Sequence, residues 1–114
     1  MKYEVMMTSQ AVADLRTVFE YIAYELLAGQ TALNQLDRLE KAIEGLEEMS
    51  ERHHVYEKEP WKSRNLRVMP VDNYLVFYIA EKEEKRVTVI RIMYGRRDIE
   101  TQLKAHTPDK DSDK

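Results

Sequence analysis

The sequence contains no cysteine, which excludes disulfides, thiol nucleophiles and thiolate zinc sites. It has only three glycines, and none lie near each other, so a glycine-rich phosphate-binding loop is also excluded. No apolar run approaches the roughly 18 residues of a membrane span, and "MKYEVMMTSQ" lacks the apolar core of a signal peptide. These absences predict a soluble, cytoplasmic protein with no membrane association.

The net charge of −3 conceals an uneven distribution of charge along the chain. Residues 1–57 carry 5 Lys or Arg against 11 Asp or Glu, whereas residues 58–97 carry 10 against 5. A basic segment in a chain this short can form a basic face, which is the electrostatic footprint of a polyanion ligand. The charge pattern therefore leaves nucleic acid open as a ligand, although the whole chain is acidic.

Hydrophobic periodicity predicts a strand and two helices in the first half of the chain. "KYEVMMT" alternates as a strand does, and Thr8 or Ser9 is suited to cap the helix that follows. Apolar residues then recur at spacings of three and four, and we expect Gly29 to end this helix in a left-handed conformation. Thr31 is suited to cap a second helix with the same spacing as far as Leu46, so the two helices form an antiparallel hairpin.

The second half of the chain predicts three strands. "RNLRVMPV", "NYLVFYIA" and "RVTVIRIMY" are rich in Val, Ile, Tyr and Phe, and turn-forming residues separate them. The order is β-α-α-β-β-β, an α+β fold in which the α-hairpin packs on one face of an antiparallel sheet. Residues 97–105 allow a short final helix. We expect a single domain over residues 1–105 and a polar, disordered tail over residues 106–114.

Arginines and tyrosines are interleaved along the last three predicted strands. Guanidinium groups pair with phosphate oxygens, and tyrosine rings stack on unpaired bases, so these residue types together suit single-stranded RNA. A solvated charged surface with half-buried tyrosines is the alternative that composition leaves open. The candidates for binding RNA or phosphate are Arg64, Arg91, Arg97 and Tyr74. Adjacent histidines at 53 and 54 are poorly placed for one metal ion, so no metal site and no cofactor are predicted.

The ordered set of motifs resembles the RelE/ParE superfamily of type II toxin–antitoxin toxins. The segments that carry the resemblance are "SQAVADLRTVFEYIA", "RNLRVMPVDNYLVFYI" and "VTVIRIMYGRRDIETQL". The resemblance implies a toxin that is neutralised by a cognate antitoxin. RelE-like members cut mRNA in the ribosomal A site without a metal, and ParE-like members poison DNA gyrase.

The resemblance implies catalytic roles for Arg67, Tyr94 and Arg96. The two arginines would stabilise charge on the phosphate, and Tyr94 would transfer a proton. The chain departs from the RelE pattern at two positions. Leu75 stands where the RelE branch usually has arginine, and "DIETQL" lacks the tyrosine expected beyond the last arginine.

We interpret the chain as a RelE-like, ribosome-dependent mRNA endonuclease. The alternatives are a ParE-like gyrase inhibitor without chemistry, and a degenerate toxin that only binds the antitoxin as a co-repressor. The predicted partners are the antitoxin and either the ribosome with mRNA or gyrase, and DNA is contacted only through the antitoxin complex. One point stays open. Bulk apolarity predicts that the face of Leu75, Phe77 and Ile79 meets the helices, whereas the resemblance places Leu75 on the ligand-facing side.

Overall fold

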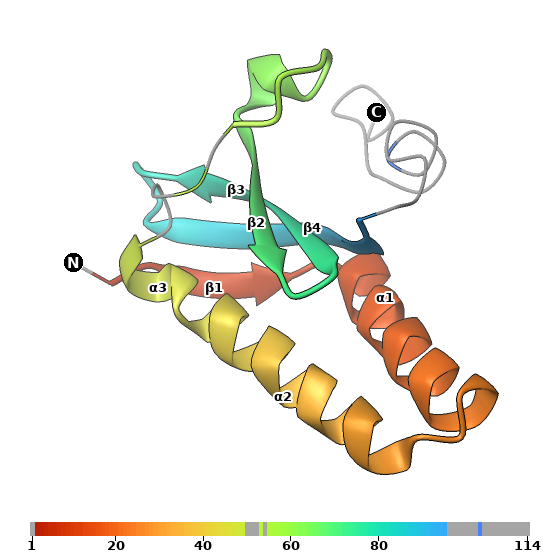
Figure 1. Cartoon of the computed structure of the whole chain (residues 1–114). Coiled ribbons are helices and arrows are strands. Elements are labelled where there is room, and N and C mark those ends of the chain that lie inside the picture. The colour runs from red at the N-terminus through yellow and green to blue at the C-terminus, as the bar shows by residue number, and fades with distance from the viewer. Residues whose placement is uncertain (1, 50–52, 54, 96–102, 104–114) are drawn as a thin grey trace.

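The computed structural model describes residues 2–49, 53, 55–95 and 103 (Figure 1). The elements in chain order are β1 (Glu4–Met7), α1 (Ser9–Glu20), the π-helical turn η1 (Tyr21–Glu25), α2 (Gly29–Glu44), α3 (Leu46–Met49), the 3₁₀ turn η2 (Lys62–Arg64), β2 (Leu66–Val71), β3 (Tyr74–Glu81) and β4 (Arg86–Tyr94). The α+β architecture and the order β-α-α-β-β-β are confirmed. The final helix that we allowed over residues 97–105 lies, except for Leu103, outside the described residues, as does the tail over residues 106–114.

The four strands form one mixed sheet in the order β1-β4-β3-β2. The meander β2-β3-β4 is antiparallel, as predicted, but β1 runs parallel to β4, from Glu4 opposite Arg86 to Met7 opposite Val89. The expectation of a wholly antiparallel sheet is therefore wrong for β1. The hairpin of α1 and α2 lies on one side of this sheet (Figure 1).

Thr8 marks the change from strand to helix, as its sequence position predicted. Its side-chain oxygen accepts a hydrogen bond from the Ala11 N–H at 3.1 Å, which caps α1. The same hydroxyl donates to the Ile90 carbonyl at 2.9 Å, and the Thr8 N–H donates to the Val89 carbonyl at 3.0 Å. One residue therefore ends the pairing of β1, begins α1 and fixes the helix beside β4.

The connection between α1 and α2 differs from the prediction. Gly29 does not end the first helix but begins α2, and Thr31 lies inside α2 rather than at its cap. The left-handed residue is Leu27, with φ of 52°. The cause is the π-helical turn η1, in which the Leu26 N–H donates to the Tyr21 carbonyl. The Ala28 N–H then donates to the Ile22 carbonyl, so that the chain reverses before Gly29.

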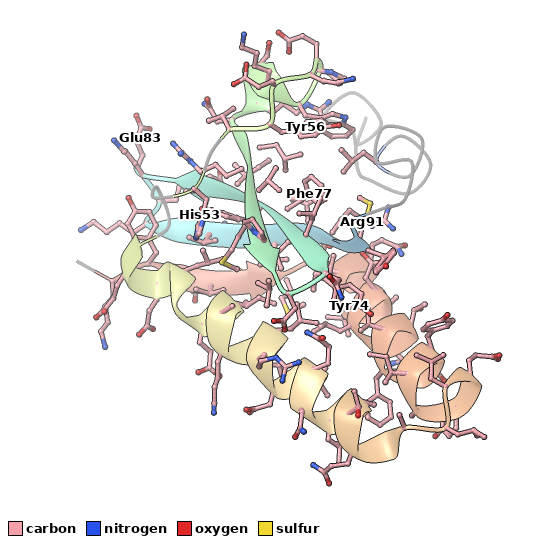
Figure 2. All side chains as sticks on the ribbon, viewed as in Figure 1. His53, Tyr56, Tyr74, Phe77, Glu83 and Arg91 are labelled. Atoms are coloured by element: carbon pink, nitrogen blue, oxygen red, sulfur yellow. The ribbon has the colours of Figure 1, made fainter. Side chains whose placement is uncertain are left out.

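Apolar side chains are buried on both faces of the sheet. Tyr78 and Val76 of β3 face the helices and pack with Leu39 of α2. Phe77 faces the opposite side, where it packs with Trp61 and with the ring of Tyr56 at 5.8 Å (Figure 2). The second cluster consists of Trp61, Leu66, Phe77, Met93 and Leu103, with Leu75 and Ile79 partly buried against it.

The face of Leu75 therefore points away from the helices, as the resemblance implied, and the expectation from bulk apolarity is wrong. The apolarity of the β3 side chains does not distinguish the two faces of the sheet, because both faces are covered. The helices cover one face, and other segments of the chain cover the face of Leu75. Tyr78, which is polar at its tip, is fully buried on the helix side.

Candidate functional site

Two of the predicted site residues, Tyr74 and Tyr94, come together at one end of the sheet. They are cross-strand partners on β3 and β4, and their ring centroids lie 5.7 Å apart at an interplanar angle of 68°. Burial raises the pKa of Tyr74, and the neighbouring Tyr94 and Tyr21 raise it further. The Tyr74 phenol is therefore protonated at neutral pH and suited to pack and to donate a hydrogen bond.

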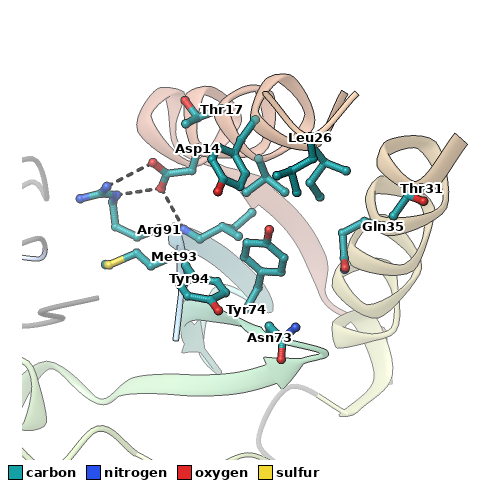
Figure 3. A pocket seen from close by; sticks show the side chains of 14 residues that line it. Asp14, Thr17, Leu26, Thr31, Gln35, Asn73, Tyr74, Arg91, Met93 and Tyr94 are labelled. Carbon is teal, nitrogen blue, oxygen red and sulfur yellow. Dashed lines mark hydrogen bonds and ion pairs between the residues drawn. The ribbon is translucent and has the colours of Figure 1, made fainter. Parts of the chain in front are cut away.

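The two tyrosines line a groove of about 640 Å³ between the helices and the sheet. We call it the tyrosine groove (Figure 3). Its helical wall includes Val18, Tyr21, Ile22 and Leu26 of α1 and η1 with Thr31 and Gln35 of α2, and its sheet wall includes Asn73, Tyr74, Ile92 and Tyr94. Aromatic and aliphatic side chains thus dominate the walls, and a few amide and hydroxyl groups interrupt them, which is typical of a site for an apolar ligand or peptide.

A buried ion pair closes one end of the tyrosine groove. Arg91 Nε donates to Asp14 Oδ2 at 2.8 Å and Arg91 Nη2 donates to Asp14 Oδ1 at 3.1 Å, with side-chain exposures of 5% and 10%. The Ile92 N–H also donates to Asp14 Oδ2 at 2.9 Å. β1 pairs with β4 only as far as Val89, so Asp14 provides the acceptor that a neighbouring strand would otherwise supply.

Arg91, predicted as a phosphate ligand, is therefore engaged by Asp14 inside the protein, and its geometry favours a structural role. Asp14 was not among the residues predicted from the sequence. A signal was present, because Asp14 follows Ala11 by three residues and precedes Val18 by four, which puts a carboxylate on the buried stripe of α1.

The other two candidate arginines that the structure describes, Arg67 and Arg64, do not line the tyrosine groove. Arg67 is the second residue of β2, pairs with Tyr78 and so shares the helix-facing side of the sheet. Its Nη1 donates to the His53 carbonyl at 2.7 Å. The Arg64 guanidinium lies 5.0 Å from the centroid of the Trp61 ring, where a cation–π contact holds it.

Among the described residues, the candidate arginines are thus held by three different partners and do not gather at one site. A bulge in β4 explains why. Tyr78 pairs with Val89 while Phe77 pairs with Arg91, which leaves Ile90 as an extra residue. Unbroken alternation would have placed Arg91 on the face of Val89, which is also the face of Arg67, and the bulge turns it to the opposite face. Arg96 and Arg97 lie outside the described residues, so their predicted roles stay predictions.

The match that decides the family is to the ParE toxin of the type II toxin–antitoxin system parDE, over residues 5–99. The chain belongs to this family. It is the toxin of a type II toxin–antitoxin system of the RelE/ParE superfamily, as the motifs indicated. No curated protein matches the chain by sequence.

Solved structures with the same fold include both branches of the superfamily. The chromosomal ParDE system of P. aeruginosa aligns at a TM-score of 0.67 with 16% identity, over 82% of this chain and 96% of that chain. The RelBE2 toxin–antitoxin complex of Mycobacterium tuberculosis gives 0.60 and 17%, over 82% and 99%. The archaeal RelE–RelB complex of Pyrococcus horikoshii OT3 gives 0.58 and 18%, over 85% and 99%. At these identities the likeness is one of fold.

Among residues 2–49, 53, 55–95 and 103, no group of three or more His, Cys, Asp or Glu is placed to hold a metal ion. Within the same ranges, no helix has the length and apolarity needed to cross a membrane.

A polar clamp fixes the sheet wall of the tyrosine groove in this ParE-family toxin. Asp72, in the turn between β2 and β3, accepts hydrogen bonds at Oδ2 from Arg38 Nε at 2.7 Å and from Gln35 Nε2 at 2.9 Å. These bonds, that from Arg38 first, hold the pKa of Asp72 below its ordinary value. The clamp ties α2 to the turn that presents Asn73 and Tyr74 to the groove.

Replacing Asp72 by asparagine is expected to destabilise the toxin at pH 7 and to have no such effect in strong acid. Because the folded-state pKa of Asp72 is lowered, its stabilisation is present above the ordinary value near 4 and is lost as the pH falls through the lower value. Asparagine tolerates the φ of 55° at this position, so the substitution removes the charge without straining the backbone. Unfolding midpoints of both proteins between pH 2 and 7 test this, and a pH-independent difference would contradict it. The effect is small, since Arg38 and Asp72 are 51% and 39% exposed.

Proposed function

We propose that this ParE-family toxin acts by binding a protein, DNA gyrase, and that an antitoxin neutralises it by occupying the tyrosine groove. The observation that supports this most is the character of the groove, which joins tyrosines and aliphatic side chains. The described cations that were candidates for phosphate binding are instead held by Asp14, by the His53 carbonyl and by the Trp61 ring.

The chemistry of RNA cleavage is less well supported by the same geometry. Metal-free cleavage needs a proton acceptor beside the ribose and positive charge around the phosphate. Burial raises the pKa of Tyr74, so this phenol is protonated at neutral pH and does not supply the proton acceptor. Leu75 stands on the face where the RelE branch usually has arginine. Both features favour a toxin that recognises a protein surface.

The proposed antitoxin contact also follows from the groove. The three structures with this fold include complexes of ParE-like and RelE-like toxins with their antitoxins. The tyrosine groove presents an apolar floor. An amphipathic helix with apolar side chains turned toward Tyr74 and Ile22 fits such a surface.

The purified toxin is expected to inhibit gyrase supercoiling of plasmid DNA and to trap cleaved DNA, because the proposed contact holds gyrase in its cleavage state. Addition of the antitoxin in molar excess is expected to restore supercoiling. The assay is a gel of plasmid topoisomers over a titration of toxin. Full supercoiling at saturating toxin, with no trapped cleavage product, would overturn the gyrase function.

One observation favours the RelE-like alternative. Tyr74 and Tyr94 form a T-shaped pair at one end of β3 and β4, and Arg96 and Arg97 follow Tyr94 in the sequence after Gly95. Tyrosine rings followed closely in the sequence by two arginines are residue types that suit an unpaired base and its phosphate. New mRNA 5′ ends in a reconstituted translation reaction, together with unaffected gyrase, would establish this alternative.

A further inference from the structure

The connection between α1 and α2 exposes a group of large apolar side chains. These are Tyr21 at 54%, Tyr24 at 67%, Leu26 at 55%, Leu27 at 87% and Leu33 at 53% exposure. We call these five side chains the hairpin tip. In the described part of the chain, the other large hydrophobic residues with comparable exposure are Met6, Val12 and Tyr94. The connection points away from the sheet (Figure 1), so the fold itself does not cover the tip, and such a concentration marks an interaction surface.

The backbone at the hairpin tip is strained at a residue that contributes little to the core. Leu27 has φ of 52°, a left-handed conformation that leucine rarely adopts. It is also 87% exposed, so its burial does not stabilise the fold. The preceding turn, η1, is a π-helix, which is rare and occurs frequently at functional sites. Strain at an exposed leucine suggests that its side chain is needed for something other than folding.

The charge around the hairpin tip has one sign. From Thr17 to Leu36 the only charged residues are Glu20 and Glu25, and both are exposed. A surface with apolar anchors, two carboxylates and no cation repels nucleic acid. It complements an apolar protein surface that has Lys or Arg at its margin.

We propose that the hairpin tip docks the toxin on its protein target, through an apolar patch of the target bordered by Lys and Arg. This inference rests on the proposed function, because it needs a protein target. Tyr21 and Leu26 belong to both the hairpin tip and the tyrosine groove, whereas Leu27 and Leu33 belong to the tip alone. Substitutions of Leu27 and Leu33 therefore separate target binding from antitoxin binding.

Leu27→Asn is the sharpest test, because stability and function are expected to change in opposite directions. Asparagine adopts the left-handed conformation more readily, so the unfolding midpoint is expected to rise by about 2–4 °C. Loss of the exposed anchor is expected to weaken gyrase inhibition about tenfold or more. Affinity for the antitoxin is expected to stay within about twofold, since Leu27 does not line the groove.

Matched variants distinguish the tip from exposed apolar residues in general. Leu33→Ser is expected to weaken gyrase inhibition as Leu27→Asn does, whereas Val12→Ser, at a similar exposure on α1, is expected to leave it unchanged. Changing Glu20 and Glu25 to Gln is expected to weaken inhibition at low salt and to have less effect at high salt. An unchanged inhibition at low salt would refute the basic margin of the target.

Growth arrest on induction of the toxin in cells separates failure of the tip from failure of the gyrase function. If the wild-type chain arrests growth but leaves gyrase unaffected, the gyrase function fails, and loss of arrest in Leu27→Asn still supports the tip. If Leu27→Asn arrests growth and inhibits gyrase as the wild type does, the tip is overturned. A wild-type chain that does neither overturns both.

Discussion

Replacing Asp14 by alanine is expected to lower the free energy of unfolding by about 3–5 kcal/mol, the usual cost of breaking a buried ion pair. The change leaves the Arg91 guanidinium buried without its counter-charge. It also removes the acceptor of the Ile92 N–H, at a stretch of β4 that has no strand on that side. The ion pair and the hydrogen bond are lost at the same place, which explains the expected size of the fall in unfolding free energy. Denaturant unfolding of the two proteins measures it.

Two controls test the cause of this loss. Asp14→Asn keeps an oxygen acceptor for the Ile92 N–H and removes the charge, so it is expected to fall between the wild type and Asp14→Ala. Asp37→Ala removes a carboxylate whose partner is the exposed Lys41, and it is expected to change stability by less than about 0.5 kcal/mol. Equal effects at positions 14 and 37 would show that the ion pair is not buried in solution.

The effect on the site follows from what the pair holds in place. Asp14 fixes α1 against β4 through the N–H of Ile92, which lies two residues before Tyr94. Both Asp14 and Tyr94 line the tyrosine groove. Asp14→Asn, which retains the fold, is therefore expected to weaken antitoxin binding more than its loss of stability explains. Asp14 would then act as a positioning residue for the groove.

Local signals in the sequence predicted the elements well. Thr8 caps α1, and the period-two runs become β2, β3 and β4, because each of these depends on neighbouring residues. Leu27 shows where this failed. Gly29 is the residue that normally takes a left-handed conformation, and the prediction followed that preference, but the π-helical turn brings the reversal two residues earlier.

The site was harder to predict because it depends on contacts that are distant in sequence. Asp14 and Arg91 are separated by 77 positions, and only the fold brings them together. The bulge between β3 and β4 then changes which face Arg91 occupies, and no residue type in "VTVIRIMY" announces it. Tyr74 and Tyr94 were named as candidates from the sequence, but their position beside the helices, at an apolar groove, follows from which face of β3 packs on α1 and α2.

Replacing Phe77 by alanine is expected to destabilise the toxin by about 3–5 kcal/mol, as expected for a large side chain removed from a packed core. Phe77 is fully buried, although it lies on the side of the sheet away from the helices, between Tyr56 and Trp61. Val12→Ala, at an exposed position, is the control and is expected to cost less than about 0.5 kcal/mol. Denaturant unfolding again gives both values.

The size of the Phe77 effect also bears on function. For the RNA-cutting toxin that we first expected, the resemblance places the face of Leu75 on the ligand-facing side of the sheet. In the structure that face is a second core, in which Leu75, Phe77 and Met93 pack with Leu103. A loss below about 1 kcal/mol for Phe77→Ala would mean that the cover over this face contributes little and can be displaced by a ligand. A loss of the expected size assigns this face to stability and leaves the tyrosine groove and the hairpin tip as the surfaces available to partners.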